Sequence, residues 1–262
     1  MKLFHRFLAV FLMIAACAGN AFADYPRPWQ LGFQEAATPV MEKITEYHNI
    51  LLVVIYSIGI FVFLLLTYTC IRFSAKNNPT PSKNTHNTLI EIIWTALPVI
   101  ILVMLCIPSM RTLYFAQKID NPDMTVKIIG NQWYWSYQYP DHGNIAFDSY
   151  IIKDADLKPG QMRLLEVDNH VVVPVDTKVR IQLTASDVIH SWAVPSFGVK
   201  IDAVPGRLNE MWFKATKLGT YYGQCSELCG TGHGFMPIAV DVVSKEDFNK
   251  WVLEAKKKFG AS

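Results

Sequence analysis

Charged side chains are scarce in this chain, and neither sign dominates. Asp, Glu, Lys and Arg together make up 18% of the 262 residues, and the formal net charge is +2. The basic residues are scattered along the chain apart from a short cluster at residues 256–258, whereas a nucleic-acid surface needs a dense basic patch. We therefore exclude a nucleic-acid-binding protein. Hydrophobic residues reach 51%, above the usual share in a soluble protein, which predicts that part of the chain lies in lipid.

Two long stretches have no charged residue at all. They cover residues 50–71 and 92–110, or 22 and 19 residues. At a rise of about 1.5 Å per residue, each is long enough to cross a hydrocarbon layer of about 30 Å. A buried helix of a soluble protein is rarely apolar around its whole circumference over such a length. We therefore expect transmembrane helices over residues 50–71 and 88–113.

The segment between these helices, residues 72–87, lacks Asp and Glu. It contains Arg72, Lys76 and Lys83, and an excess of basic residues in a short loop is typical of the cytoplasmic side. Residues 24–49, which carry four acids against two basic residues, are then expected outside the cytoplasm. The part of the chain that follows the second helix is expected on the same outer side.

The first 23 residues have the composition of a signal peptide. Basic residues precede an apolar run over residues 7–16, and a small-residue Ala-Phe-Ala sequence ends at Ala23. We expect cleavage of residues 1–23 after Ala23, since the apolar run is short for a membrane span of about 20 residues. The alternative is lipid modification of Cys17, because residues 14–17 loosely resemble a lipoprotein attachment motif.

The outer part of the chain alternates short β-prone runs with turn residues. The runs are rich in β-branched residues and are separated by Gly, Pro, Asn and Asp. They cover residues 125–129, 162–167, 178–184, 210–213 and 237–243. This pattern predicts an all-β domain over residues 120–243. Residues 244–262 are expected to form a helix and tail, with the helix over 245–259, because Ser244 and Asp247 match a capping box.

Cysteine is also sparse, with five residues in the chain. Three lie in the leader or in the predicted spans, where we expect inert apolar side chains: Cys17, Cys70 and Cys106. The other two, Cys225 and Cys229, lie in the predicted outer domain, where a disulfide is the ordinary expectation for an arbitrary pair. A disulfide, however, leaves the neighbouring His233 and Met236 unexplained.

The residues around this cysteine pair are those that copper prefers. The chain offers two thiols, the imidazole of His233 and the thioether of Met236 within residues 225–236, and a second imidazole, His190, lies upstream. Soft thiolate and thioether ligands combined with imidazole select copper, whereas zinc makes little use of Met. A β-sandwich with such ligands is typical of blue-copper electron carriers, which need one Cys. The second Cys is explained if two thiolates bridge two copper ions.

Four motifs resemble subunit II of the haem-copper cytochrome c oxidases. They are the ligand loop at 225–236, His-Ser-Trp-Ala-Val-Pro at 190–195, Pro-Gly-Arg at 205–207 and Gln-Trp-Tyr-Trp-Ser-Tyr at 132–137. The resemblance covers about residues 47–251. It implies a two-helix transmembrane hairpin followed by an all-β cupredoxin-like sandwich. Quinol-oxidising relatives lack the Cys pair, so the resemblance also implies cytochrome c as the electron donor.

The resemblance also implies roles for individual residues. The ligands of the two copper ions fall on His190, Cys225, the backbone carbonyl of Glu227, Cys229, His233 and Met236. The Glu227 side chain would help bind magnesium at the junction with subunit I, since a carboxylate suits that ion. Trp133 is implied to be the residue at which electrons enter, while Tyr134 and Trp135 are expected to be packing residues.

Further acidic residues take implied roles outside the metal site. Glu91, at the cytoplasmic start of the second span, would be the acid at which protons enter a path into subunit I; the plain alternative is that it caps the helix. The acids expected to dock a basic cytochrome c are Asp148, Glu166, Asp168 and Asp187. Gln138 stands where mitochondrial relatives carry an acid, so the docking charge is expected to differ.

These expectations describe the electron-accepting subunit of a complex that reduces oxygen to water and pumps protons, with subunits I and III as partners. The leader favours the inner membrane of a bacterium, with the copper domain in the periplasm. A copper chaperone or thiol redox protein is an alternative, although such a site needs fewer ligands. A purely structural Cys225–Cys229 disulfide is a second alternative. The copper domain of nitrous oxide reductase is a third, but it has no such hairpin.

Overall fold

The computed structural model describes residues 24–260. The predicted leader, residues 1–23, with the alternative lipid site at Cys17, lies outside the described residues, as do residues 261–262. Within the described range the chain divides into two compact units. One is a helical hairpin of residues 42–118, and the other combines residues 24–41 with residues 119–260.

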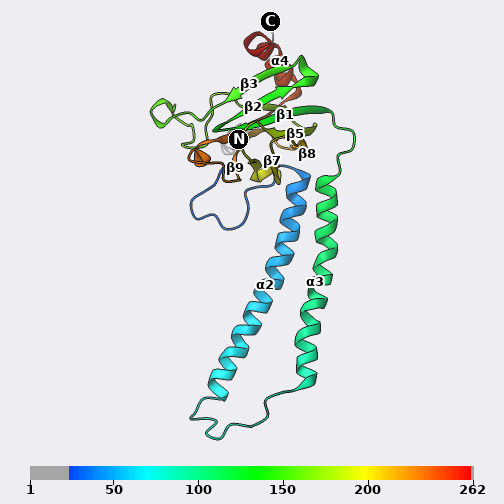
Figure 1. Cartoon of the computed structure of the whole chain (residues 1–262), viewed down its shortest axis with the longest axis vertical. Helices are drawn as coiled ribbons and strands as arrows, with labels where there is room; N and C mark the ends of the chain where they lie inside the picture. The colour runs from blue at the N-terminus through cyan, green and yellow to red at the C-terminus, as the bar shows by residue number, and fades with distance from the viewer. Residues whose placement is uncertain (1–23, 261–262) are drawn as a thin grey trace, which may run out of the picture. The chain divides into compact units, whose positions relative to one another are not determined.

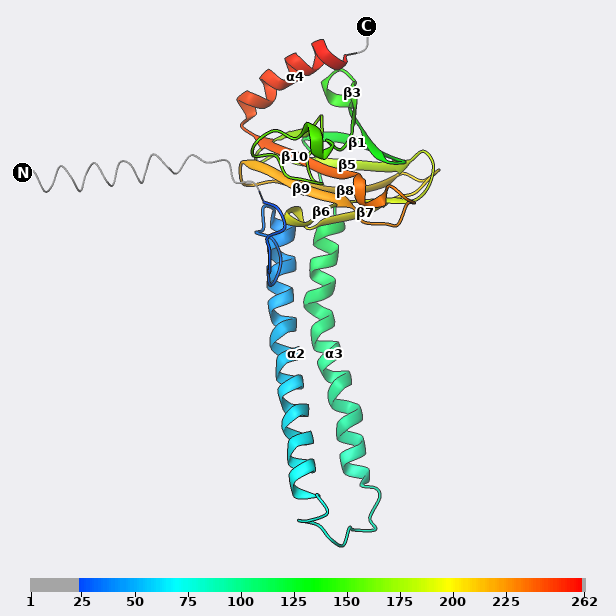
Figure 2. The same cartoon turned by 90° about the vertical axis from the view of Figure 1, so that its left-hand side faces the viewer.

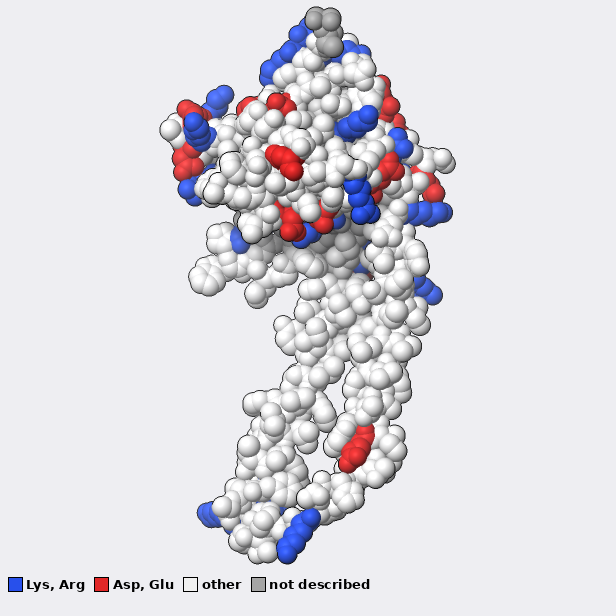
Figure 3. Space-filling model, in the orientation of Figure 1, with Lys and Arg blue, Asp and Glu red and all other residues white. Residues whose placement is uncertain are grey.

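The hairpin is formed by two long helices, α2 (Pro39–Arg72) and α3 (Thr88–Gln117) (Figure 1). In each helix the most apolar window of 18 residues, with a mean hydropathy of 2.9 in α2 and 2.6 in α3, has no buried residue. Figure 3 shows that charged side chains are almost absent along both helices and reappear near the connecting loop. Because a core helix of a soluble protein buries its apolar face, both helices have the length and the surface of membrane spans.

Helix α2 extends beyond the uncharged stretch that indicates it. The Thr38 hydroxyl accepts a hydrogen bond from the Met41 N–H at 3.1 Å, and Pro39 opens the helix where its missing N–H costs nothing. The first turns then include Glu42 and Lys43, which are good helix formers. The absence of charge therefore marks the part of the helix suited to lipid and does not mark where the helix begins.

The second unit is a β-sandwich of two five-stranded sheets (Figure 2). One sheet has the strand order β3-β2-β1-β5-β8, and the other has the order β4-β10-β9-β6-β7. Neighbouring strands are antiparallel except for the pairs β1–β5 and β4–β10. The strands are β1 (Met124–Asn131), β2 (Tyr134–Tyr139), β3 (Ile145–Ser149), β4 (Val171–Pro174), β5 (Lys178–Ala185), β6 (His190–Val194), β7 (Val199–Ala203), β8 (Asn209–Lys214), β9 (Gly219–Cys225) and β10 (Pro237–Val243).

Alternate side chains of the strands fill the space between the sheets. In β5, Val179, Ile181 and Leu183 are buried while the residues between them are partly exposed, as expected for a strand with one face toward a core. Trp135 of β2 and Trp192 of β6 are the largest fully buried side chains among the described residues. The packed core therefore fixes the strands whose ends carry the candidate site.

Four of the five predicted β-prone runs lie in strands. Residues 125–129, 178–184, 210–213 and 237–243 fall in β1, β5, β8 and β10. The prediction for residues 162–167 is wrong. There the Glu166 N–H bonds the Met162 carbonyl at 3.0 Å, and Leu164 has a φ of 66°. The segment pairs with another part of the described chain only through an isolated bridge between Ile151 and Val167, so it forms a turn and not a strand.

Helix α4 (Lys245–Phe259) has the predicted bounds. The Ser244 hydroxyl accepts a hydrogen bond from the Asp247 N–H at 3.1 Å, which caps the first turn. Phe248, Val252 and Ala255 are buried in the core cluster of the sandwich. The helix therefore covers one end of the sandwich with an apolar face, while its charged residues stay in solvent.

Residues 24–38 run along the sandwich before α2 begins. The Asp24 N–H donates to the Thr220 carbonyl at 3.0 Å, and the Thr38 hydroxyl donates to the Phe197 carbonyl at 2.7 Å. Glu35 forms an ion pair with Lys217 at 2.6 Å. The segment that precedes the first span is thus fixed to the same unit as the candidate site.

Candidate metal centre

Strand pairing brings the two ligand-bearing segments together. His190 opens β6, and Cys225 closes β9, which is paired with β6 through Trp192 opposite Cys225. The chain then leaves the sheet as a loop and returns to it in β10. The Cys225 N–H donates to the Met236 carbonyl at 3.2 Å, which closes the base of this loop.

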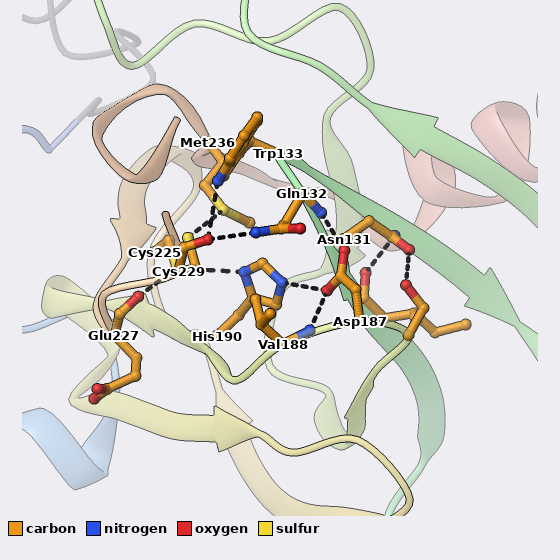
Figure 4. Close-up of polar contacts among 12 residues, drawn as sticks. Asn131, Gln132, Trp133, Asp187, Val188, His190, Cys225, Glu227, Cys229 and Met236 are labelled. Carbon is orange, nitrogen blue, oxygen red and sulfur yellow. Dashed lines mark hydrogen bonds and ion pairs between the residues drawn. The ribbon is translucent and has the colours of Figure 1, made fainter. Parts of the chain in front are cut away.

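The two cysteines lie at the centre of the site with their sulfurs side by side (Figure 4). Their Sγ atoms are 3.8 Å apart, compared with about 2.05 Å in a disulfide, so both are free thiols. The Nδ1 atom of His190 lies 3.9 Å from Cys225 Sγ, and that of His233 lies 3.6 Å from Cys229 Sγ. Each thiol therefore has an imidazole beside it.

Two further donor atoms complete the group. The Met236 Sδ atom lies 3.5 Å from Cys229 Sγ, and the Glu227 carbonyl oxygen lies 3.4 Å from Cys225 Sγ. The structure thus brings together all six atoms that the sequence indicates as ligands. The Glu227 carboxylate is exposed and points away from the sulfurs in Figure 4, so its carbonyl and its side chain face different surroundings.

The residues present fit a copper centre. Two thiols, two imidazoles and a thioether are the soft and intermediate donors that copper selects. His190, Cys225, Cys229 and Met236 are all buried, and buried donors keep water from competing for a metal. Among the described residues, His190, Cys225 and Cys229 also form a cluster whose donor atoms lie within 4.8 Å of one another. The structural-disulfide alternative does not account for this arrangement.

The two thiols have pKa values displaced in opposite directions. Burial raises the pKa of Cys225, but hydrogen bonds with His190 and with the backbone of Glu227 and Ser191 outweigh burial and lower the pKa to about 6. Burial and the charge of Cys225 raise the pKa of Cys229 to about 12. Because the pKa of Cys229 is raised, a metal that binds both sulfurs must displace a proton.

Asp187 orients the imidazole of His190. Its Oδ1 atom lies 2.8 Å from His190 Nε2, on the opposite side of the ring from Cys225. A carboxylate on one ring nitrogen fixes the ring and leaves the other nitrogen for a metal. Burial lowers the pKa of His190, but hydrogen bonds with Cys225 and Asp187 raise it above the ordinary value. Asp187, which was predicted as a docking acid, thus contacts the predicted copper ligand His190 directly.

Trp133 lies against the ligand loop and is only partly buried. Its indole Nε1–H donates to the Cys229 carbonyl at 3.2 Å. A side chain at Gly232 would overlap the indole ring, and one at Gly230 would crowd it. Gly230 and Gly232 thus allow the indole ring to lie directly on the backbone next to Cys229. Tyr134 stacks on Tyr150, whereas Trp135 is fully buried.

Gln132 is a contact residue that sequence reasoning missed. Its side-chain Nε2 donates to the Cys229 carbonyl at 2.8 Å, and its backbone N–H donates to Asp187 Oδ2 at 2.7 Å. The only signal in the sequence is its position beside Trp133 in the aromatic motif. Spacing alone could not indicate that the amide reaches the ligand loop.

The four predicted docking acids have different surroundings. Asp148 and Asp168 are exposed, and they accept hydrogen bonds from the Ser136 hydroxyl at 2.6 Å and the Tyr150 N–H at 2.8 Å. Glu166 is 4% exposed, so the expectation that it is a surface acid is wrong. The turn of residues 162–167 directs it inward to His170 and Tyr222.

Glu91 belongs to the hairpin unit and lies in the first turn of α3. Its carboxylate accepts a hydrogen bond from the Asn87 N–H at 3.4 Å, while the Asn87 side chain caps the Ile90 N–H at 3.2 Å. The plain capping role considered for Glu91 is therefore present in the structure. The Glu91 side chain is partly buried.

Two family descriptions match most of the chain. Residues 26–112 match the transmembrane domain of cytochrome c oxidase subunit II, and residues 124–243 match the periplasmic domain of the same subunit. One match covers the hairpin and the other covers the sandwich, and both describe subunit II of cytochrome c oxidase.

Relatives and a solved structure agree with these matches. A probable cytochrome c oxidase subunit 2 of Rickettsia felis is 56% identical over 95% of this chain and 78% of its own length, and one of Rickettsia bellii is 58% identical over 90% and 88%. The crystal structure of the periplasmic domain of subunit II of cytochrome oxidase from Bradyrhizobium japonicum is 57% identical, with a TM-score of 0.51, and covers 55% of this chain and 100% of that chain. This chain is therefore a membrane protein of the cytochrome c oxidase subunit II family.

Proposed function

We propose that this subunit holds two copper ions and accepts electrons from cytochrome c, which it delivers to the haem of subunit I. The observation that carries the proposal is the convergence of six donors, two of which are free thiols: His190, Cys225, the Glu227 carbonyl, Cys229, His233 and Met236. When bound, the copper pair supplies a one-electron carrier that works without making or breaking covalent bonds to a substrate.

The chain's own residues would hold this centre rigid and dry. The base of the ligand loop is closed between Cys225 and Met236, and Asp187 fixes the His190 ring. Burial of the three sulfurs and of His190 keeps water from these four donors, while His233 is partly exposed. A donor set that is already in place changes little when one electron arrives or leaves, which favours rapid transfer.

Trp133 is proposed as the residue at which electrons enter. Its ring is partly exposed, so a partner can reach it, and its indole nitrogen is bonded to the carbonyl of the ligand Cys229. Asp148, Asp168 and Asp187 are proposed to attract the basic surface of cytochrome c, an effect of charge that acts on the association rate more than on affinity. Glu166 is left out of this set because it is buried.

The remaining assignments concern the assembled complex. The complex is proposed to reduce oxygen to water and to pump protons, with subunits I and III as partners. The exposed Glu227 carboxylate is proposed as a magnesium ligand at the junction with subunit I. Glu91 is proposed as the acid at which protons enter a path into subunit I, since a partly buried acid at a helix end in a membrane protein is a candidate for such a role.

We place the protein in the inner membrane of a bacterium with the sandwich in the periplasm. The support is the connecting loop, residues 72–87, which is basic and lacks acids, since such loops stay in the cytoplasm. The sandwich would then face the periplasm, where a soluble cytochrome c can reach it.

The test uses the full chain in detergent, reduced and then loaded with copper. Two coppers per chain with a seven-line hyperfine pattern in electron paramagnetic resonance support the proposal. A Cys229→Ser variant should lose this pattern, whereas a Cys106→Ser variant, altered in the membrane helix, should keep it. A four-line mononuclear signal, or a copper-free chain whose disulfide returns after reduction and reloading, would contradict the proposal and favour a chaperone or a structural role.

A further inference from the structure

We propose that Gln132 is a positioning residue that ties the two halves of the ligand set to each other. Its backbone binds the carboxylate that holds His190, and its side chain binds the carbonyl of Cys229 (Figure 4). We call this chain of contacts, from His190 through Asp187 and Gln132 to Cys229, the ligand strap. The inference rests on the proposed copper function and adds to it a residue that is not itself a ligand.

The first half of the ligand strap runs through Asp187. One carboxylate oxygen lies 2.8 Å from His190 Nε2, and the other accepts the Gln132 N–H at 2.7 Å. The Val188 N–H adds a third bond to the same carboxylate at 2.6 Å. Because both oxygens are engaged, the carboxylate has little freedom to turn, and the His190 ring is fixed relative to the backbone of Gln132.

The second half runs through the Gln132 side chain. Its amide donates to the Cys229 carbonyl at 2.8 Å, and Trp133 Nε1–H donates to the same oxygen at 3.2 Å. A Cβ atom at Gly230 would lie 3.1 Å from the Gln132 amide nitrogen. Gly230, which has no Cβ atom, therefore leaves room for the Gln132 amide. The amide in turn holds the backbone of Cys229 in place.

The backbone at Gln132 is itself well anchored. The preceding strand, β1, ends at Asn131, whose side-chain oxygen accepts a hydrogen bond from the Ser186 hydroxyl at 2.6 Å. The Ser186 N–H donates to the Gly130 carbonyl at 3.1 Å. At Gly130 a Cβ atom would lie only 2.8 Å from the His190 ring. The ligand strap therefore starts from a fixed strand end that packs directly on the imidazole.

The ligand strap restrains the distance between His190 and Cys229, which the sheet does not set. His190 belongs to a strand, but Cys229 lies in an irregular loop that leaves the sheet after Cys225 and returns at Met236. Nothing in the sheet pairing holds Cys229 at a set distance from His190. A residue bonded to both segments supplies that restraint, and groups that orient metal ligands typically change metal affinity about 10- to 100-fold when they are removed.

Gln132→Leu is the direct test, because it removes the amide donor and keeps a side chain of similar size. Gln132 is exposed, so the substitution leaves the core intact. Gln182→Leu is the matched control: Gln182 is also a sandwich glutamine whose amide makes one hydrogen bond, to Glu210 at 2.6 Å, and it does not contact the site. Both variants are made in the full chain and purified in detergent.

The first readout needs no metal. The reduced, copper-free chain is treated with an alkylating agent, and modification of Cys229 is followed by peptide mass spectrometry. Loss of the side-chain bond should speed modification of this buried thiol about five-fold, the factor expected for one hydrogen bond, while Gln182→Leu should match the unsubstituted chain. Equal rates in Gln132→Leu and in the unsubstituted chain would overturn the ligand strap.

The second readout uses the copper-loaded chain. Gln132→Leu should lose copper to a chelator about 10- to 100-fold faster than Gln182→Leu and should show altered hyperfine splittings in electron paramagnetic resonance. An unchanged spectrum and an unchanged rate of copper loss would overturn the inference. If instead the unsubstituted chain fails to take up two coppers, the proposed function is wrong, and the alkylation rates alone decide whether the ligand strap exists.

Discussion

The imidazole Nε2 of His170 lies 2.6 Å from the carboxylate of Glu166, which is almost completely buried in the sandwich. The other ring nitrogen, Nδ1, lies 3.0 Å from Asp241 on β10. Tyr222 donates to the second oxygen of Glu166 at 3.2 Å. His170 is thus placed between two acids, and the charge of the imidazole decides whether they are neutralised.

This placement predicts that the copper-free chain becomes less stable as the pH rises above about 6.5. Burial lowers the pKa of His170, but hydrogen bonds and charge interactions with Asp241 and Glu166 raise it above its ordinary value. A raised pKa in the folded state means that the folded chain binds the proton more tightly, so the stabilisation is complete below about pH 6.5 and is lost as the pH rises through the raised pKa. Thermal unfolding of the chain and of His170→Gln between pH 5.5 and 9 measures the effect; parallel pH profiles would contradict it.

Electron transfer from cytochrome c should depend on Trp133 and not on its neighbour. In the assembled complex, Trp133→Leu should slow cytochrome c oxidation by at least about 10-fold, equivalent to about 1.4 kcal/mol of activation free energy. The variant should still bind copper, since Trp133 is not a proposed ligand and the Gln132 amide still binds the Cys229 carbonyl. Tyr134→Leu is the control, because Tyr134 stacks on Tyr150 beside the same motif. Equal loss of rate in both variants would show that the aromatic patch acts only by packing.

Docking by charge should appear as a dependence on ionic strength. Asp148→Asn and Asp168→Asn should each raise the KM for cytochrome c about two- to five-fold with kcat little changed, and the effect should fade as salt is added, since exposed charges are screened over about 8 Å at physiological salt. Glu246→Gln, which removes an exposed acid from the start of α4, should have no such effect. A loss that persists at high salt would argue against electrostatic docking.

Two glycines of the ligand loop give a matched pair. An added methyl group at Gly232 overlaps the Trp133 ring, whereas at Gly234 it meets no atom within 4 Å. We expect Gly232→Ala to lower the free energy of unfolding by about 1–3 kcal/mol, the usual cost of overpacking, and to displace the indole. Gly234→Ala should be nearly neutral. Unfolding midpoints and tryptophan fluorescence of the two copper-free variants provide the comparison, and similar values would contradict the contact.

The sequence predicts the parts of the structure that depend on residue type and leaves open those that depend on tertiary neighbours. The donor atoms of Cys225, Cys229, His233 and Met236 meet because they share one short loop, and the helices are indicated by the absence of charge. Strand β2 is not indicated by β-branched runs, because Tyr134–Tyr139 is rich in aromatic residues and alternates only in burial.

The wrong prediction for Glu166 and the failure to identify Gln132 also result from tertiary contacts. Glu166 is an acid in a polar segment, so its sequence indicates a surface position, but partners distant in the chain, such as Tyr222, satisfy it inside the sandwich. Gln132 is uncharged and exposed, and only its contact with Cys229 reveals a role. Residues whose function is a hydrogen bond to a backbone carbonyl carry no signature in their spacing.

The hydrogen bond between the Cys225 N–H and the Met236 carbonyl closes the base of the ligand loop. We call residues 226–235, which lie between these two residues, the cassette. Residues 226–235 begin and end at neighbouring positions of a paired β9 and β10, so their length and composition can change while the register of both strands is kept. Three of the six donor groups, those of Glu227, Cys229 and His233, belong to this cassette. Replacing residues 226–235 would therefore change three of the six proposed donors while the pairing of β9 and β10 is kept.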